Sequence, residues 1–120
     1  MASHGIKDQV AIIGMGCTQF KEHWDRSADD LMIDAVGDTL ASAGVAKDDI
    51  DAWWLGTAQS GMSGVTLAAP LKLDNKPVTR VENYCATGSE AFRNACLAIA
   101  SGTYDIVLVL VAEKLKDRGG

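Results

Sequence analysis

One cysteine of this 120-residue chain occupies a position that suits a reactive thiol. Cys85 lies in the stretch VENYCATGSEAFRNACLAIASG, between a β-branched run and the first turn of an expected helix. The dipole and the free N–H groups of such a turn stabilise a thiolate, and they can also bind the oxyanion formed when it attacks a carbonyl. The next residues, Ala86 to Ser89, are small and leave room for an acyl group. The position therefore predicts a nucleophile at a strand-to-helix turn, with inert packing of a small thiol as the alternative.

The remaining thiols and imidazoles offer less chemistry. Cys96 falls mid-helix, where packing is expected, and Cys17 follows a Gly-Met-Gly turn, where we also expect a structural role. His4 lies near the chain start and His23 in a loop, so neither is assigned to catalysis. Three cysteines without paired spacing predict no disulfide framework and no metal site, which favours a reducing compartment.

The elements that would position Cys85 alternate between strands and helices. Apolar runs closed by glycine or following proline predict four strands: Val10–Gly14, Ala52–Gly56, Val78–Tyr84 at an edge, and a central strand at Ile106–Ala112. Periodic apolar residues and end signals predict three helices: Ala28–Ala43, Val65–Leu73, and one that runs from just after Cys85 to Ser101. For the first helix, Ser27 and Asp30 form a capping-box pattern and Gly44 a left-handed stop. This order predicts a doubly wound α/β domain with its site at the carboxyl ends of parallel strands.

Composition excludes several classes of partner. The net charge of −5 and the pI near 4.8 argue against a nucleic-acid surface, because phosphate binding needs a basic face. The longest apolar run, Ile106–Ala112, is too short to span a bilayer, and the first residues lack the apolar core of a signal peptide. We therefore expect a soluble, cytoplasmic protein whose first residues, 1–8, are flexible.

Several stretches together resemble one known family. NYCATGSEAFRNACLAIASGTYDIVLVLVAEKL is similar to the nucleophilic-cysteine segment of the thiolase superfamily, above all its branch related to the sterol-carrier-protein thiolases. VAIIGMGCTQF, SADDLMIDAVGDTLASAG and DDIDAWWLGT resemble the opening strand, helix and second strand of that branch, in the same order. The motif positions are Asn83, Cys85, Gly88 and Ala91. The resemblance implies a thiolase-like layered α/β fold with a mostly parallel mixed sheet, in which residues 1–120 form the first part of the N-terminal domain.

The resemblance also implies a reaction. Cys85 would carry the acyl group as a thioester, and its own N–H would belong to an oxyanion hole. A 3-oxoacyl-CoA would be cleaved with free coenzyme A, or formed in the reverse Claisen condensation. Coenzyme A is then a co-substrate, and no cofactor is bound permanently. A homodimer through Val78–Tyr84 and a companion protein with a zinc ribbon and an OB-fold are the implied partners.

The chain departs from the family pattern in one respect. The family's general bases, a histidine and a second cysteine, come from a second half that the sequence does not contain, and His4, His23, Cys17 and Cys96 match neither. We therefore expect a fragment of a longer enzyme. A natural short subunit completed by another chain and a non-catalytic relative are the alternatives.

Two further interpretations compete with acyl transfer. Gly14 and Gly16 fit the first glycines of a dinucleotide-binding loop, but Gln19 occupies the third position and no helix is expected at that turn. The other interpretation is an assembly module in which Cys85 is a spectator. Glu113 and Lys114 at the end of the last strand are expected to be solvated, and Lys72, Lys76 and Arg80 receive no role.

Overall fold

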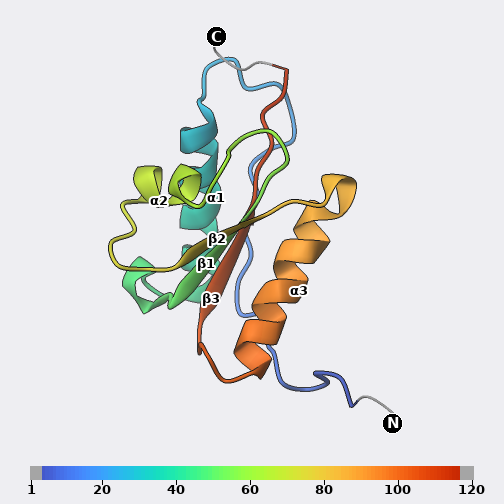
Figure 1. The fold of residues 1–120 in the computed structure, drawn as a ribbon. Coiled ribbons are helices and arrows are strands. Elements are labelled where there is room, and N and C mark those ends of the chain that lie inside the picture. The colour runs from blue at the N-terminus through green and yellow to red at the C-terminus, as the bar shows by residue number, and fades with distance from the viewer. Residues whose placement is uncertain (1–3, 117–120) are drawn as a thin grey trace.

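A three-stranded sheet separates two helices on one face from a third helix on the other (Figure 1). The computed structural model describes residues 4–116. Its strands are β1 (Ala52–Gly56), β2 (Val78–Val81) and β3 (Val107–Val111), and its helices are α1 (Ala28–Ala43), α2 (Val65–Leu71) and α3 (Thr87–Ala100), with short 3₁₀ turns η1 (Lys47–Asp49) and η2 (Tyr84–Ala86). The strand order is β2-β1-β3 and both pairings are parallel. The α/β class with a thiolase-like parallel sheet is confirmed.

Helix α1 begins and ends where its local signals predict. The Ser27 hydroxyl accepts the Asp30 N–H at 3.1 Å, and the Asp30 carboxylate accepts the Ser27 N–H at 2.9 Å. The Ser27 N–H, together with the Ser27 hydroxyl, which also donates to this carboxylate at 2.8 Å, holds the pKa of Asp30 below its usual value. At the other end Gly44 takes a left-handed φ of 68° and donates to the carbonyls of Leu40 and Ala41. Both ends are therefore fixed by local backbone chemistry.

Neighbouring tryptophans on β1 serve two different cores. Trp53 is fully buried in the layer under α1 and α2, with Met32 and Leu67. Trp54 faces α3, in a cluster that includes Ala91, and its ring meets Tyr104 edge-on with centroids 6.2 Å apart. Because side chains alternate along a strand, both faces of β1 are covered.

The central strand is β1, not the last strand. β2 is an edge strand as expected, but within residues 4–116 β3 pairs only with β1, so the prediction of a central strand at Ile106–Ala112 is wrong for the part described. Its apolar run reflects burial of both faces, because Leu108 and Leu110 face α1 while Val107 and Val109 face α3. Burial of the faces does not fix how many neighbours a strand has.

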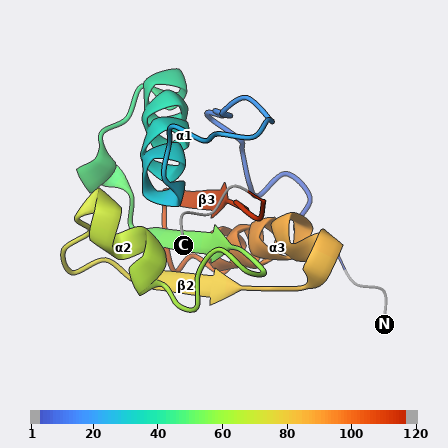
Figure 2. The same cartoon turned by 90° about the horizontal axis from the view of Figure 1, so that it is seen from above.

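The expected strand at Val10–Gly14 is absent. The segment is extended but pairs with no strand of residues 4–116, and Ile12 remains 72% exposed. Its last residue reaches the end of α1 instead, where a Cβ on Gly14 would come within 2.6 Å of the Ala43 Cβ, and the chain that follows runs beside this helix (Figure 2). The Met15 N–H donates to the Ser42 hydroxyl at 3.2 Å. An apolar run forms a strand only where a free sheet edge meets it, and this run meets a helix.

Smaller differences concern element ends. β2 ends at Val81 and not at Tyr84, and α2 ends at Leu71 because Lys72 turns left-handed with φ 51°. Of the expected flexible start, residues 1–3 lie outside the described residues, and flexibility of residues 4–8 stays a prediction. No helix in residues 4–116 has the length and apolarity needed to cross a membrane.

Candidate functional site

The carboxyl ends of all three strands meet at one edge of the sheet. Gly56 at the end of β1 pairs with Val81 on β2 and with Val111 on β3. The Thr57 N–H donates to the Val81 carbonyl at 3.3 Å, and the Ala112 N–H donates to the Gly56 carbonyl at 3.1 Å. The loops that leave the strands therefore start side by side, as expected for the site of a parallel α/β sheet.

Cys85 sits in the turn between β2 and α3. It is exposed, it belongs to η2, and α3 begins two residues later at Thr87. Tyr84 before it has a positive φ of 46°, which bends the chain sharply at this point. The structure thus brings the thiol to the surface at the leading turn of a helix, and the alternative of inert packing is not observed.

The other cysteines behave differently from one another. Cys96 on α3 is buried, which confirms its packing role. Cys17 is exposed and its thiol donates to the Thr18 carbonyl at 3.2 Å, so it does not fill a core position.

A threonine that the sequence reasoning did not single out closes the turn around Cys85. The Thr87 hydroxyl accepts the Asn83 N–H at 2.8 Å and donates to the Tyr84 carbonyl at 2.7 Å. The Thr87 N–H donates to that same carbonyl. The residue is only 5% exposed. A threonine two positions after a turn cysteine is a recognisable local hydrogen-bonding signal.

Small residues keep the base of the turn close to the sheet. A Cβ on Gly56 would lie 3.1 Å from the Thr87 Cγ2 and 3.3 Å from the Val111 Cγ2. A Cβ on Gly88 would lie 3.5 Å from the same valine methyl. A side chain at position 56 would therefore press against the threonine that holds the turn.

Glu113 organises the neighbouring loop, contrary to the expectation that it is merely solvated. Its carboxylate accepts the hydroxyls of Thr57 and Ser60, each at 3.0 Å, and the N–H groups of Ala58 and Gln59. Burial raises the pKa of Glu113, but these donors together outweigh it and hold the pKa below its usual value. One carboxylate thus ties the loop after β1 to the end of β3.

Two cations brace the same region. Arg80 donates from Nη2 to the carbonyls of Thr57 at 2.9 Å and Ala58 at 3.2 Å. Lys114 is 8% exposed and donates from Nζ to the His23 carbonyl at 2.7 Å. Both side chains serve backbone carbonyls of this chain, and neither extends as a free charge towards a ligand.

Replacing Glu113 with glutamine is expected to lower the free energy of unfolding by about 1 kcal/mol near neutral pH, because charged acceptors make the stronger hydrogen bonds but solvent screens this exposed carboxylate in part. A carboxylate whose pKa is depressed in the folded state stabilises the fold above its unfolded pKa, about 4.3, and loses that effect as the pH falls through the lower folded value. Urea denaturation at a series of pH values between about 2 and 7 measures the free energy of unfolding of both proteins. The difference between wild type and variant should become smaller in acid. Asp74→Asn, at an exposed carboxylate, is the control, and an equal effect there would contradict the assignment.

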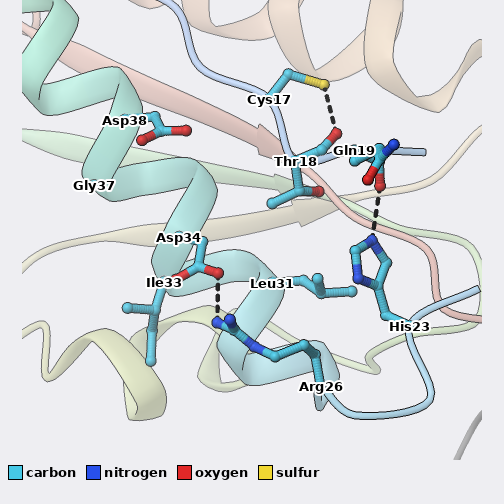
Figure 3. Close-up of a pocket in the computed structure, with 10 residues that line it drawn as sticks. All are labelled: Cys17, Thr18, Gln19, His23, Arg26, Leu31, Ile33, Asp34, Gly37 and Asp38. Atoms are coloured by element: carbon cyan, nitrogen blue, oxygen red, sulfur yellow. Dashed lines mark hydrogen bonds and ion pairs between the residues drawn. The ribbon is translucent and has the colours of Figure 1, made fainter. Parts of the chain in front are cut away.

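A separate hollow of about 620 Å³ lies between the loop after Gly16 and α1 (Figure 3). Cys17, His23 and Asp38 are among its lining residues, and the Arg26–Asp34 ion pair closes part of its wall. The His23 ring hydrogen-bonds the Gln19 carbonyl at 2.7 Å, so this imidazole is engaged locally. Cys85 does not line the hollow.

The described residues form neither a group of metal ligands nor a dinucleotide-binding loop. Within residues 4–116 no three His, Cys, Asp or Glu side chains are grouped as metal ligands. A Cβ on Gly16 would lie 2.7 Å from the Thr39 N, so this glycine packs against α1. From residue 4 onward no strand precedes the Gly14–Gly16 turn, and no helix starts at it, so these residues do not form the pyrophosphate cradle of a dinucleotide fold.

Comparison with known proteins agrees with this architecture. Residues 10–119 match the family described as the thiolase N-terminal domain. An acetyl-CoA acetyltransferase of Methanocaldococcus jannaschii is 40% identical over 114 residues, covering 90% of this chain and 29% of that protein. Sterol carrier protein 2 of Gallus gallus is 30% identical over 114 residues, covering 92% of this chain and 21% of that protein.

The same relationship is visible in three dimensions. A solved chain of the Ltp2-ChsH2(DUF35) aldolase superposes with a TM-score of 0.76 at 26% identity, covering 92% of this chain and 28% of that one. The chain spans less than a third of the length of these relatives. Because the family match extends over most of the residues, the chain belongs to the thiolase family through its N-terminal domain.

Proposed function

We propose that this chain supplies the nucleophilic cysteine of a thiolase-type acyltransferase acting on coenzyme A thioesters. The observation that carries the proposal is the exposure of Cys85 in the turn that leads into α3. Two relatives named acetyl-CoA acetyltransferase, 40% and 37% identical, support the same class of reaction.

The chemistry at Cys85 consists of two transfers. The Cys85 thiolate attacks the carbonyl carbon of an acyl donor, and the negative charge moves to the carbonyl oxygen. When the carbonyl re-forms, the bond between the carbonyl carbon and the leaving group breaks. If the donor is an acyl-CoA, the leaving group is the thiolate of coenzyme A. If the donor is a 3-oxoacyl-CoA, the leaving group is the carbanion of acetyl-CoA, which takes up a proton. The thiolate of free coenzyme A then attacks the acyl-Cys85 thioester and releases Cys85. The Cys85 N–H stabilises the oxyanion, and the leading turn of α3 stabilises the thiolate.

Acetyl transfer to the protein tests the proposal directly. The purified protein, with any chain that co-purifies, is incubated with acetyl-CoA, quenched in acid and digested, and its peptides are analysed by mass spectrometry. We expect an acetyl thioester on the peptide that contains Cys85, and we expect added free coenzyme A to remove it. An acetyl group found equally on Cys17, or found only after denaturation, would exclude a folded acyl-transfer site at Cys85.

A non-catalytic subunit or assembly module is the second candidate, and one observation favours it. The name of the structural neighbour joins two components, so the same fold also occurs in a protein named as part of an assembly. Iodoacetamide separates the two candidates. Alkylation of Cys85 well below pH 8, about the range of an unassisted thiol, favours the nucleophile, whereas sluggish alkylation favours the module.

The partners follow from the same proposal. A homodimer would form through β2, whose outer edge is unpaired in the part of the chain described and whose Thr79 is exposed. The name of the structural neighbour joins two components, which supports a companion chain. We propose that this companion is of the zinc-ribbon and OB-fold kind. Acyl-CoA would be the substrate and coenzyme A the co-substrate. We also propose that residues 1–120 are the first part of the thiolase N-terminal domain.

A further inference from the structure

In the described residues, only the carbonyl of the Tyr84–Cys85 peptide group has hydrogen-bond partners. Its carbonyl, on Tyr84, accepts both the Thr87 hydroxyl at 2.7 Å and the Thr87 N–H. Its N–H, on Cys85, donates to no protein atom within residues 4–116. Because a peptide group is planar and trans, fixing the direction of the carbonyl also fixes the opposite direction of the N–H.

The hydroxyl of Thr87 is itself held in place. It accepts the Asn83 N–H at 2.8 Å, so its own proton is left for the Tyr84 carbonyl. The side chain is 5% exposed and its methyl group packs against the Gly56 backbone, where a Cβ would lie within 3.1 Å. Burial keeps water from competing for these two hydrogen bonds.

From these contacts we infer that Thr87 is a positioning residue that aims and polarises the Cys85 N–H as an oxyanion donor. Two donors on the Tyr84 carbonyl draw electron density towards its oxygen, which makes the N–H of the same peptide a stronger donor. The inference rests on the proposed acyl transfer at Cys85. It assigns the threonine no contact with substrate.

Two substitutions at one position test this role. Thr87→Val removes the hydroxyl and keeps the shape of the side chain, whereas Thr87→Ser keeps the hydroxyl. Thr103→Val, at an exposed position just beyond the carboxyl end of α3, is the matched control. Two rates are measured for each protein: acetylation of Cys85 by acetyl-CoA, which passes through an oxyanion, and alkylation of Cys85 by iodoacetamide, which does not.

The expected result is a separation of the two rates. Acetylation should fall about 10- to 100-fold in Thr87→Val, since loss of a whole oxyanion donor costs about 100- to 1000-fold. Alkylation should change less than about threefold, and Thr87→Ser and Thr103→Val should keep both wild-type rates. If both rates fell in parallel in Thr87→Val, the role of the hydroxyl would be purely structural. If acetylation were unchanged, the hydroxyl would have no role at Cys85. Either result overturns the inference. If wild-type Cys85 is not acetylated at all, the proposed function fails instead.

Discussion

Cys85→Ala is expected to abolish acetylation of the protein by acetyl-CoA, with a fall of at least about a thousandfold, because it removes the thiolate that takes up the acyl group. Cys96 is buried within α3, and Cys17 lies in the loop beside α1, on the opposite face of the sheet from α3. Acetylation is followed by mass spectrometry of the intact protein. Alkylation by iodoacetamide should be lost at position 85 and should persist at Cys17, which is also exposed.

The same variant should leave the fold intact. The Cys85 side chain is exposed, so its truncation should change the free energy of unfolding by less than about 0.5 kcal/mol. Cys17→Ala provides the matched control, since it removes another exposed thiol. If acetylation survived in Cys85→Ala, or disappeared in Cys17→Ala, the nucleophile would have been assigned to the wrong residue.

Trp53→Ala is expected to have the largest effect on stability. The indole is fully buried between β1 and the α1–α2 layer, and truncation of such a side chain costs about 3–5 kcal/mol. Its Nε1 has no hydrogen-bond partner in the described residues, so the loss is one of packing and not of a polar contact. Domains of this kind are stable by only about 5–15 kcal/mol, so the variant should be close to unfolding at room temperature.

Urea denaturation followed by circular dichroism measures this loss. Trp24→Ala is the control, because that indole is 71% exposed and should contribute less than about 0.5 kcal/mol. A Trp53→Ala protein as stable as the control would mean that the layer between β1 and α1 is not the main core.

Some elements could be predicted from sequence because their signals are local. The Ser27 capping box and the left-handed Gly44 lie within one turn of the helix ends they determine, and the predicted bounds of α1 are confirmed. The bounds of β1 are confirmed for a similar reason, because the apolar run ends at Gly56. The turn that carries Cys85 was also predictable, since a strand and a helix follow each other there within a few residues.

Other features depend on partners distant in sequence. Whether Val10–Gly14 forms a strand depends on a free sheet edge, and in the described residues that segment meets α1 instead. Glu113 binds the hydroxyls of Thr57 and Ser60 across 56 and 53 residues of sequence, which no local pattern encodes. The role of Thr87 could have been found locally, because all its polar partners lie within four residues.

The alternation of Trp53 and Trp54 across β1 gives the molecule two built-in optical probes. One indole lies in the layer under α1 and α2, and the other in the layer under α3, next to Tyr104. Indole emission shifts to the red when water reaches the ring, so each tryptophan reports wetting of its own layer. With the exposed Trp24 also replaced by phenylalanine, phenylalanine at position 53 or 54 would leave one buried tryptophan. The two halves of the interior could then be observed separately as the protein is denatured.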